Sequence, residues 1–178
     1  LVFGQRKLRP VGLPRPPRSE PAGHWAAELI ESFGLAAPSR CDTRLHSDGA
    51  GARDALFEVI ESARHSLDLS TFIIADDAPG LEVITRLSRR ARGGIKVRVL
   101  LDGFGALSLP RTHFDSLRDA GAEVAVFRPI FSLRRSGPRN LRNHRKLTIA
   151  DDHSLWSGGR NLTGEYFQGN DAHPVALE

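Results

Sequence analysis

A regular alternation of hydrophobic patterns between residues 52 and 127 restricts the folds open to this chain. Helical spacing, with apolar residues three and four positions apart, alternates with short apolar runs of strand length. This alternation predicts a layered α/β domain. The expected elements are a helix from Ala52, strand Ser66–Ile74, helix Pro79–Arg92, strand Ile95–Leu101, helix Thr112–Ala120, and strands Glu123–Phe127, Arg145–Ala150 and His153–Ser157.

The first 44 residues differ from the rest in composition. Five prolines and five basic residues fall within residues 1–23, which is typical of an extended linker. A short helix from about His24 to Phe33 is expected next. We therefore expect residues 1–44 to form a basic, proline-rich linker with one helix, and residues 45–178 to form a globular domain. The linker is either a plain tether or a segment attracted to anionic lipid headgroups.

Composition and charge exclude several classes of protein. Among 178 residues the single Cys41 can neither close an intramolecular disulfide nor build a cysteine zinc site. No apolar stretch approaches the roughly 20 residues needed to span a bilayer, and residues 1–23 lack the apolar core of a signal peptide. We expect a chain that is cytoplasmic or peripheral at a membrane. The net charge of +4 suits an anionic partner but is also common on proteins without one.

The chemistry-bearing residues begin at His144 and Lys146, two positions apart in a strand-like run. Side chains alternate along a strand, so the imidazole and the ammonium group are expected on the same face. Asp151 is seven positions from His144, an odd offset. Its carboxylate is therefore expected on the opposite face, near a turn, and is not expected to contact His144.

Gly158 and Gly159 follow the next strand, where the lack of side chains lets backbone N–H groups approach an anion closely. Asn161 adds an amide donor. With the imidazole and the ammonium group, these donors form a plausible phosphodiester site. Attack by neutral imidazole on phosphorus gives a phosphohistidine, and the donors stabilise charge on the non-bridging oxygens. The scheme requires no metal or cofactor.

This pattern resembles the signature of the phospholipase D superfamily, HxKxxxxD followed by six residues and then GSxN or GGxN. The spacing matches completely at His144, Lys146, Asp151, Gly158, Gly159 and Asn161. Segments 97–105, 120–127 and 164–167 resemble the bacterial cardiolipin synthase branch. The resemblance covers roughly residues 45–170 and implies one catalytic half with a layered α/β/α sandwich of the phospholipase D type.

The resemblance also implies roles for the motif residues. His144 would be the covalent nucleophile, Lys146 and Asn161 would hold the phosphate oxygens, and Asp151 would order the motif. The alternative for His144 is a strand histidine that is hydrogen-bonded in a core. In this family an acidic residue elsewhere orients the histidine. Two local candidates are Glu165 and Asp171, and the sequence does not distinguish them.

One departure from the family concerns the number of motifs. Members use two, because the second histidine protonates the leaving alkoxide across a pseudo-two-fold axis. Here there is one, and only 17 residues follow Asn161. The chain also begins at Leu1 and contains no Met, so an upstream segment, which could hold a membrane anchor, is expected. We expect the N-terminal half of a two-motif protein, with the second half downstream or in a homodimer. Loss of one general acid lowers rates by ~10²–10⁴-fold.

Three functions follow from these residues. The leading one is an enzyme that transfers a phosphatidyl group between alcohols, as in cardiolipin synthesis, or hydrolyses the headgroup ester of a phospholipid. A nuclease of the same superfamily is the second, although nucleic acid is the less expected partner. The third is a non-catalytic lobe that binds an anion.

Two other groups of residues are weaker candidates. A metal site of His144, Asp151, Asp152 and His153 is disfavoured because the first two point to opposite faces. The arginines before the motif either attract a phosphate-rich substrate or line a solvated loop. They are Arg134, Arg135, Arg139 and Arg142.

Overall fold

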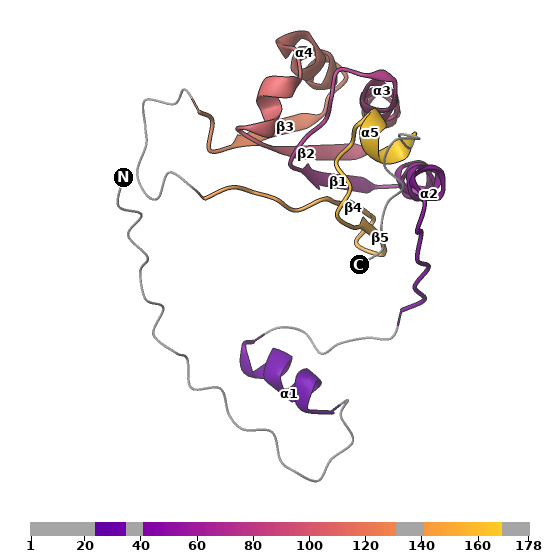
Figure 1. The fold of residues 1–178 in the computed structure, drawn as a ribbon, viewed down its shortest axis with the longest axis vertical. Coiled ribbons are helices and arrows are strands. Elements are labelled where there is room, and N and C mark those ends of the chain that lie inside the picture. The colour runs from indigo at the N-terminus through magenta and orange to yellow at the C-terminus, as the bar shows by residue number, and fades with distance from the viewer. Residues whose placement is uncertain (1–23, 35–40, 131–140, 169–178) are drawn as a thin grey trace. The chain divides into compact units, whose positions relative to one another are not determined.

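The computed structural model describes residues 24–34, 41–130 and 141–168. The chain divides into two units, residues 1–44 and 45–178, which are described separately. In the first unit, helix α1 spans His24–Ser32, where the sequence predicts a helix (Figure 1). No helix among the described residues combines the length and the apolar character that a membrane span requires.

The second unit contains the predicted alternation of helices and strands (Figure 1). The 3₁₀ helix η1 and the short helix α5 were not predicted. The elements are α2 (Gly49–Ser62), β1 (Ser66–Thr71), α3 (Ala78–Arg92), β2 (Lys96–Asp102), η1 (Gly105–Ser108), α4 (Arg111–Asp119), β3 (Glu123–Phe127), β4 (Leu147–Ala150), β5 (Ser154–Ser157) and α5 (Gly164–Phe167).

Several strand boundaries differ from the prediction, and β2 is shifted by one residue at each end. β1 ends at Thr71, and Ile74 instead forms an isolated parallel bridge with Leu162. Ile74 is buried in the core although it lies beyond the end of β1. The apolar run in the sequence is therefore longer than the strand. Regular pairing in β4 begins at Leu147 rather than Arg145, and β5 begins one residue later than expected.

The five strands form one mixed sheet in the order β3-β2-β1-β4-β5. β1, β2 and β3 are parallel, as helical crossovers require, and β4 and β5 join the other side antiparallel. The carboxyl ends of the parallel strands therefore meet at one edge. The two helices that connect to β1 and β2 begin at aspartate caps: Asp48 accepts from Gly51 N in α2 and Asp77 from Gly80 N in α3.

One face of the sheet carries the core. α2 packs on β4 and β5, α3 on β2 and α4 on β3 (Figure 1). Alternate strand residues point into this layer, and the register aligns them across neighbouring strands. They include Leu67, Leu69, Val97, Val99, Leu101, Ala150 and Trp156. The indole Nε1–H of Trp156 donates to the carbonyl of Ala52, so the buried indole is satisfied.

The opposite face carries mixed side chains. Asp68 on β1 pairs with Arg98 on β2, and Leu155 on β5 is exposed. The predicted layered α/β class is confirmed. Helices cover one face of the sheet in the part of the chain that the structure describes, so the second helical layer of the expected α/β/α sandwich is not among these residues.

The chain is closely packed where β1 and β2 end. A Cβ at Gly105, the first residue of η1, would overlap the carbonyl oxygen of Phe72, the residue after β1. The backbone after β2 can approach the end of β1 this closely because position 105 has no side chain.

We predict that Gly105→Ala lowers the free energy of unfolding by about 3 kcal/mol, because the backbone must move to admit one methyl group. Chemical denaturation followed by circular dichroism measures the change. Ser108→Ala, at an exposed position of the same 3₁₀ helix, is the control and should unfold like the parent. Equal stability of the two variants would contradict the close approach.

Candidate active site

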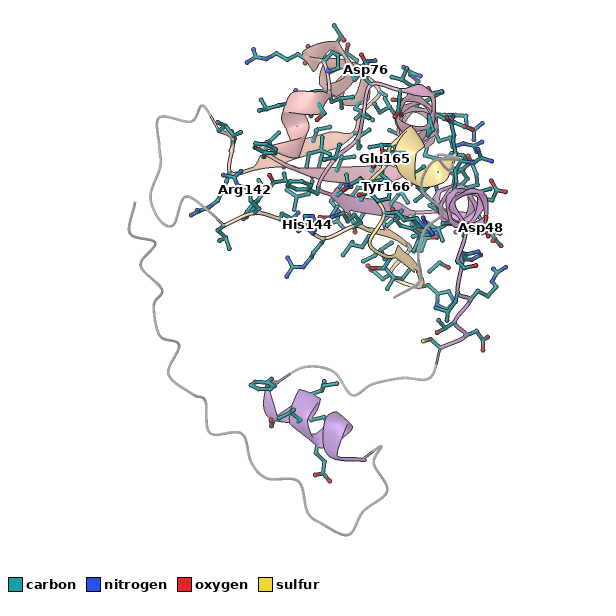
Figure 2. The ribbon with its side chains drawn as sticks, viewed as in Figure 1. Asp48, Asp76, Arg142, His144, Glu165 and Tyr166 are labelled. Carbon is teal, nitrogen blue, oxygen red and sulfur yellow. The ribbon has the colours of Figure 1, made fainter. Side chains whose placement is uncertain are left out.

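His144 and Lys146 lie directly before β4 in the chain. Figure 2 shows His144 on the extended segment that leads into this strand. The Nζ atom of Lys146 is 2.9 Å from Nε2 of His144 and 3.1 Å from the carbonyl oxygen of His144. The predicted convergence of the two side chains on one face is confirmed. The imidazole is exposed, whereas Lys146 is 3% exposed.

Lys146 is a buried cation without an acidic partner. No carboxylate within the described ranges pairs with its ammonium group, and burial lowers the pKa of the amine. An ammonium group only donates hydrogen bonds, so His144 accepts at Nε2. A ring that accepts at Nε2 carries its proton on Nδ1. A neutral ring with a lone pair on Nε2 is the form that can attack phosphorus.

Phe72 lines one side of this pair. Its ring centroid lies 4.9 Å from that of His144 at an angle of 55°, and Nζ of Lys146 lies 5.4 Å from the Phe72 centroid. The face of an aromatic ring attracts a cation, and its bulk excludes water. Phe72 therefore compensates in part for the missing carboxylate. Sequence patterns did not single out this residue, which lies 72 positions before His144.

Asp102, at the end of β2, holds the segment that carries the motif. Its fully buried carboxylate accepts hydrogen bonds from the backbone N–H of Asn143 and of Phe104, both at 2.8 Å, and lies 3.4 Å from Nη1 of Arg142. The residue directly before His144 is thereby fixed to the central sheet. Sequence analysis missed Asp102, although a carboxylate at the end of an apolar strand was a usable signal.

Asp151 lies in the turn between β4 and β5, with a positive φ of 54°. Its carboxylate accepts from the backbone N–H groups of Arg64 at 2.7 Å and of His65 and Ser66 at 2.8 Å. These three donors lower the pKa of the carboxyl group to about 2. No hydrogen bond joins Asp151 to His144, which agrees with the opposite-face placement inferred from strand alternation.

The two glycines of the motif differ in their backbone bonds. Gly158 N–H donates to the carbonyl of Lys146 at 3.3 Å, so this amide is already used within the hairpin. Gly159 N–H has no hydrogen-bond acceptor among the described residues. A Cβ at either glycine would meet no atom within 4 Å, which leaves open space beside both. Asn161 is buried, and its Oδ1 has no hydrogen-bond partner among the residues that the structure describes.

The structure describes one of the two acidic candidates for orienting His144. Glu165 is exposed on α5, and no hydrogen bond joins it to His144 (Figure 2). The backbone of α5 is held instead at Gly164, whose N–H donates to Asp77 at 2.7 Å. Asp171 lies outside the described residues. So do three of the four arginines before the motif, and the fourth, Arg142, reaches Asp102.

The arrangement is suited to an anionic, electrophilic group. It brings together a neutral imidazole, a buried ammonium group and an unused backbone amide next to open space. In the part of the chain that the structure describes, no three His, Cys, Asp or Glu side chains are placed to hold a metal ion.

Comparison with known proteins places this chain among related sequences. The family described as "Cardiolipin synthase, PLD-like domain" matches residues 56–177. Cardiolipin synthase 1 of Bacillus anthracis is 34% identical over 160 residues, which cover 89% of this chain and 31% of that protein. Cardiolipin synthase A of Pseudomonas putida (strain W619) is 38% identical over 127 residues, which cover 71% of this chain and 26% of that protein. The chain spans about a third or less of the length of these relatives.

One solved structure is more distant. NucT from Helicobacter pylori superposes with a TM-score of 0.49 at 21% identity, over 67% of this chain and 74% of that chain.

The hydrogen bonds of Asp151 lead to a prediction about stability. We expect Asp151→Asn to lower the melting temperature at pH 7 by several degrees, because an amide lacks the charge that three backbone donors stabilise. The pKa is about 2 in the folded chain against an ordinary 3.8. The stabilisation is therefore fully present above pH 3.8 and is lost as the pH falls toward 2.

Thermal unfolding followed by circular dichroism from pH 7 to pH 2 tests this. The difference between parent and variant should shrink below about pH 4. Asp152→Asn is a matched control, because this neighbour shares the turn and the positive φ but accepts no hydrogen bond from a described residue. A difference that stays constant down to pH 2 would contradict the assigned role.

Proposed function

The chain belongs to the cardiolipin synthase, PLD-like domain family, and we propose that it carries the nucleophilic half-site of an enzyme that transfers or hydrolyses the phosphodiester of a phospholipid. The observation that carries this proposal is the buried ammonium group of Lys146, hydrogen-bonded to Nε2 of His144 without a carboxylate partner. A buried cation of this kind is stabilised when an anion enters beside it. A phosphodiester supplies both that anion and the atom that the imidazole attacks.

The proposed reaction has two steps. In the first, the lone pair of His144 Nε2 forms a bond to phosphorus, and the bond from phosphorus to the leaving alcohol breaks. Lys146 transfers its hydrogen bond from Nε2 to a non-bridging oxygen, and Gly159 N–H and the Asn161 amide are the further donors. The leaving alkoxide takes a proton from a general acid. In the second, an alcohol or water attacks phosphorus, the N–P bond breaks, and the attacking oxygen returns its proton to that same group.

The general acid would be supplied by a second half. In the family pattern it is the histidine of another HxK pair, and we propose that it comes from a further part of a longer chain or from a second copy. Asp151 has a structural role in this scheme, because its carboxylate is bound to backbone N–H groups away from the imidazole. A phospholipid substrate also implies peripheral contact with a membrane.

We predict that a substrate with a good leaving group will label His144 without the second half. Phosphatidyl-p-nitrophenol releases p-nitrophenolate, which needs no proton to leave. The chain should release about one equivalent in a burst and gain an acid-labile adduct at residue 144, read by mass spectrometry. His144→Gln should lose burst and adduct but keep the parent melting temperature, because residue 144 is exposed.

Arg145→Gln is the matched control for this experiment. Its side chain is exposed next to His144 but points to the other face, so its burst should equal that of the parent. An equal burst from His144→Gln would reject His144 as the nucleophile. If the parent forms no adduct, the chain is a non-catalytic anion-binding lobe. If it forms an adduct with a thymidine p-nitrophenyl phosphodiester but not with the lipid, it is a nuclease.

A second prediction separates the catalytic role of Lys146 from its contribution to stability. Lys146→Met should reduce the burst rate by ~10²–10³-fold, because the donor to the phosphate is lost. The same variant should melt at or above the parent temperature at pH 7, since a desolvated ammonium group is removed. Burial lowers the pKa of Lys146 below its ordinary value of 10.5. The free-energy cost of burying the charged group is therefore present at neutral pH and disappears as the pH rises toward 10.5.

Arginine should not replace this lysine. Lys146→Arg places a planar, larger cation in a buried position, and its burst rate should also fall by at least ~10²-fold. Lys96→Arg is the control, because Lys96 is exposed and only 4.0 Å from Glu123 across the sheet surface. A near-normal rate for Lys146→Arg would show that any positive charge suffices and would contradict the proposed clamp.

A further inference from the structure

An aromatic pair extends from the candidate active site toward solvent. Phe72 contacts His144 and Lys146 on one side, and its ring is stacked on Phe104 on the other, with centroids 6.3 Å apart and planes 9° apart. Phe104 is 57% exposed. A continuous aromatic surface therefore leads from the reactive imidazole to an open ring.

Exposed aliphatic residues also occur on the segments that carry Phe104 and His144. The described residues leave six large apolar side chains exposed, and three of them belong to this region: Phe104, Leu107 and Leu141. Leu107 N–H donates to the carbonyl of Phe104, so both residues share one turn. Leu141 lies two residues before Asn143. The backbone N–H of Asn143 is bound to Asp102, the residue after which the loop of Phe104 begins. Three of the six exposed large apolar residues thus lie on the two segments that the carboxylate of Asp102 joins.

The position of Phe104 is fixed by the surrounding structure. Its backbone N–H donates to the buried carboxylate of Asp102, and the next residue, Gly105, approaches the backbone of Phe72 closely. An exposed phenylalanine held in this way does not result from a loose loop. Its exposure leaves apolar surface available for a ligand.

We infer that Phe72 and Phe104 form the subsite for the glycerol and acyl part of a phospholipid whose phosphate lies at Lys146 and His144. The inference rests on the proposed function, because the phosphate at Lys146 determines which part of the substrate reaches Phe72. An acyl chain suits this subsite because the exposed ring of Phe104 and the exposed Leu107 in the same turn offer apolar contact and no side-chain donor or acceptor for the edge of a base. Phe104 is then a specificity residue rather than a catalytic one.

The test measures binding of non-cleavable ligands by isothermal titration calorimetry. Two phosphonate analogues of phosphatidylglycerol are compared, one with two hexanoyl chains below its critical micelle concentration and one without acyl chains. The parent should bind the acylated analogue at least ~10-fold more tightly. Phe104→Ala should weaken binding of the acylated analogue about tenfold and leave binding of the deacylated analogue unchanged.

Leu155→Ala is the matched control, because Leu155 is equally exposed but lies on β5. It should bind both analogues like the parent. Equal affinity of the parent for the two analogues, or equal weakening of both by Phe104→Ala, would overturn the inference. A third ligand, the phosphonate analogue of thymidylyl-thymidine, tests base stacking. If Phe104→Ala weakens its binding more than that of the acylated analogue, the aromatic pair is a base platform instead.

Failure of this inference is distinguishable from failure of the proposed function. The binding experiment involves no covalent step, whereas the p-nitrophenolate burst reports only that step. A burst without acyl preference rejects the subsite and leaves the nucleophile in place. An acyl preference without a burst supports the subsite and rejects the covalent mechanism.

Discussion

A buried ammonium group without a carboxylate is the constraint around which the rest of the site is built. Desolvation disfavours the charged form of Lys146, and nothing within the described ranges neutralises it. The surroundings compensate with weaker interactions: the imidazole Nε2, the carbonyl oxygen of His144 and the ring face of Phe72. None of them carries a negative charge. The buried ammonium group would be stabilised further by an anion beside it, and this supports the proposed binding of a phosphate there.

The segment that carries these side chains is fixed at both ends by carboxylates that do not take part in the proposed chemistry. Asp102 binds the backbone N–H of Asn143 on one side, and Asp151 binds three backbone N–H groups at the start of β1 on the other. Between them, the carbonyl of Lys146 accepts from Gly158 N–H and from the hydroxyl of Ser157. Side chains held on rigid elements in this way keep the spacing that nucleophile and clamp require.

Local periodicity accounts for what could be predicted from the sequence. The alternation of helices and strands, the convergence of His144 with Lys146, and the position of Asp151 at a turn all follow from the repeat of two or 3.6 residues along one element. Contacts between distant elements do not follow from such a repeat. The bond from Asn143 to Asp102 joins residues 41 positions apart, and the contact of Phe72 with His144 joins the residue after β1 to the segment before β4. Gly158 could be recognised as part of a motif, but only the hairpin register shows that its N–H is already used.

The proposed apolar subsite and the segment of the proposed nucleophile are held by the same residue, Asp102. Asp102 uses one carboxylate oxygen for Phe104 N–H and the other for Asn143 N–H, so the exposed aromatic ring and the segment of the nucleophile are attached to the same buried group. The close approach at Gly105 fixes the distance between Phe104 and Phe72 from the other side. Because His144 follows Asn143 directly, the proposed apolar subsite and the proposed nucleophile are both held in place through the carboxylate of Asp102.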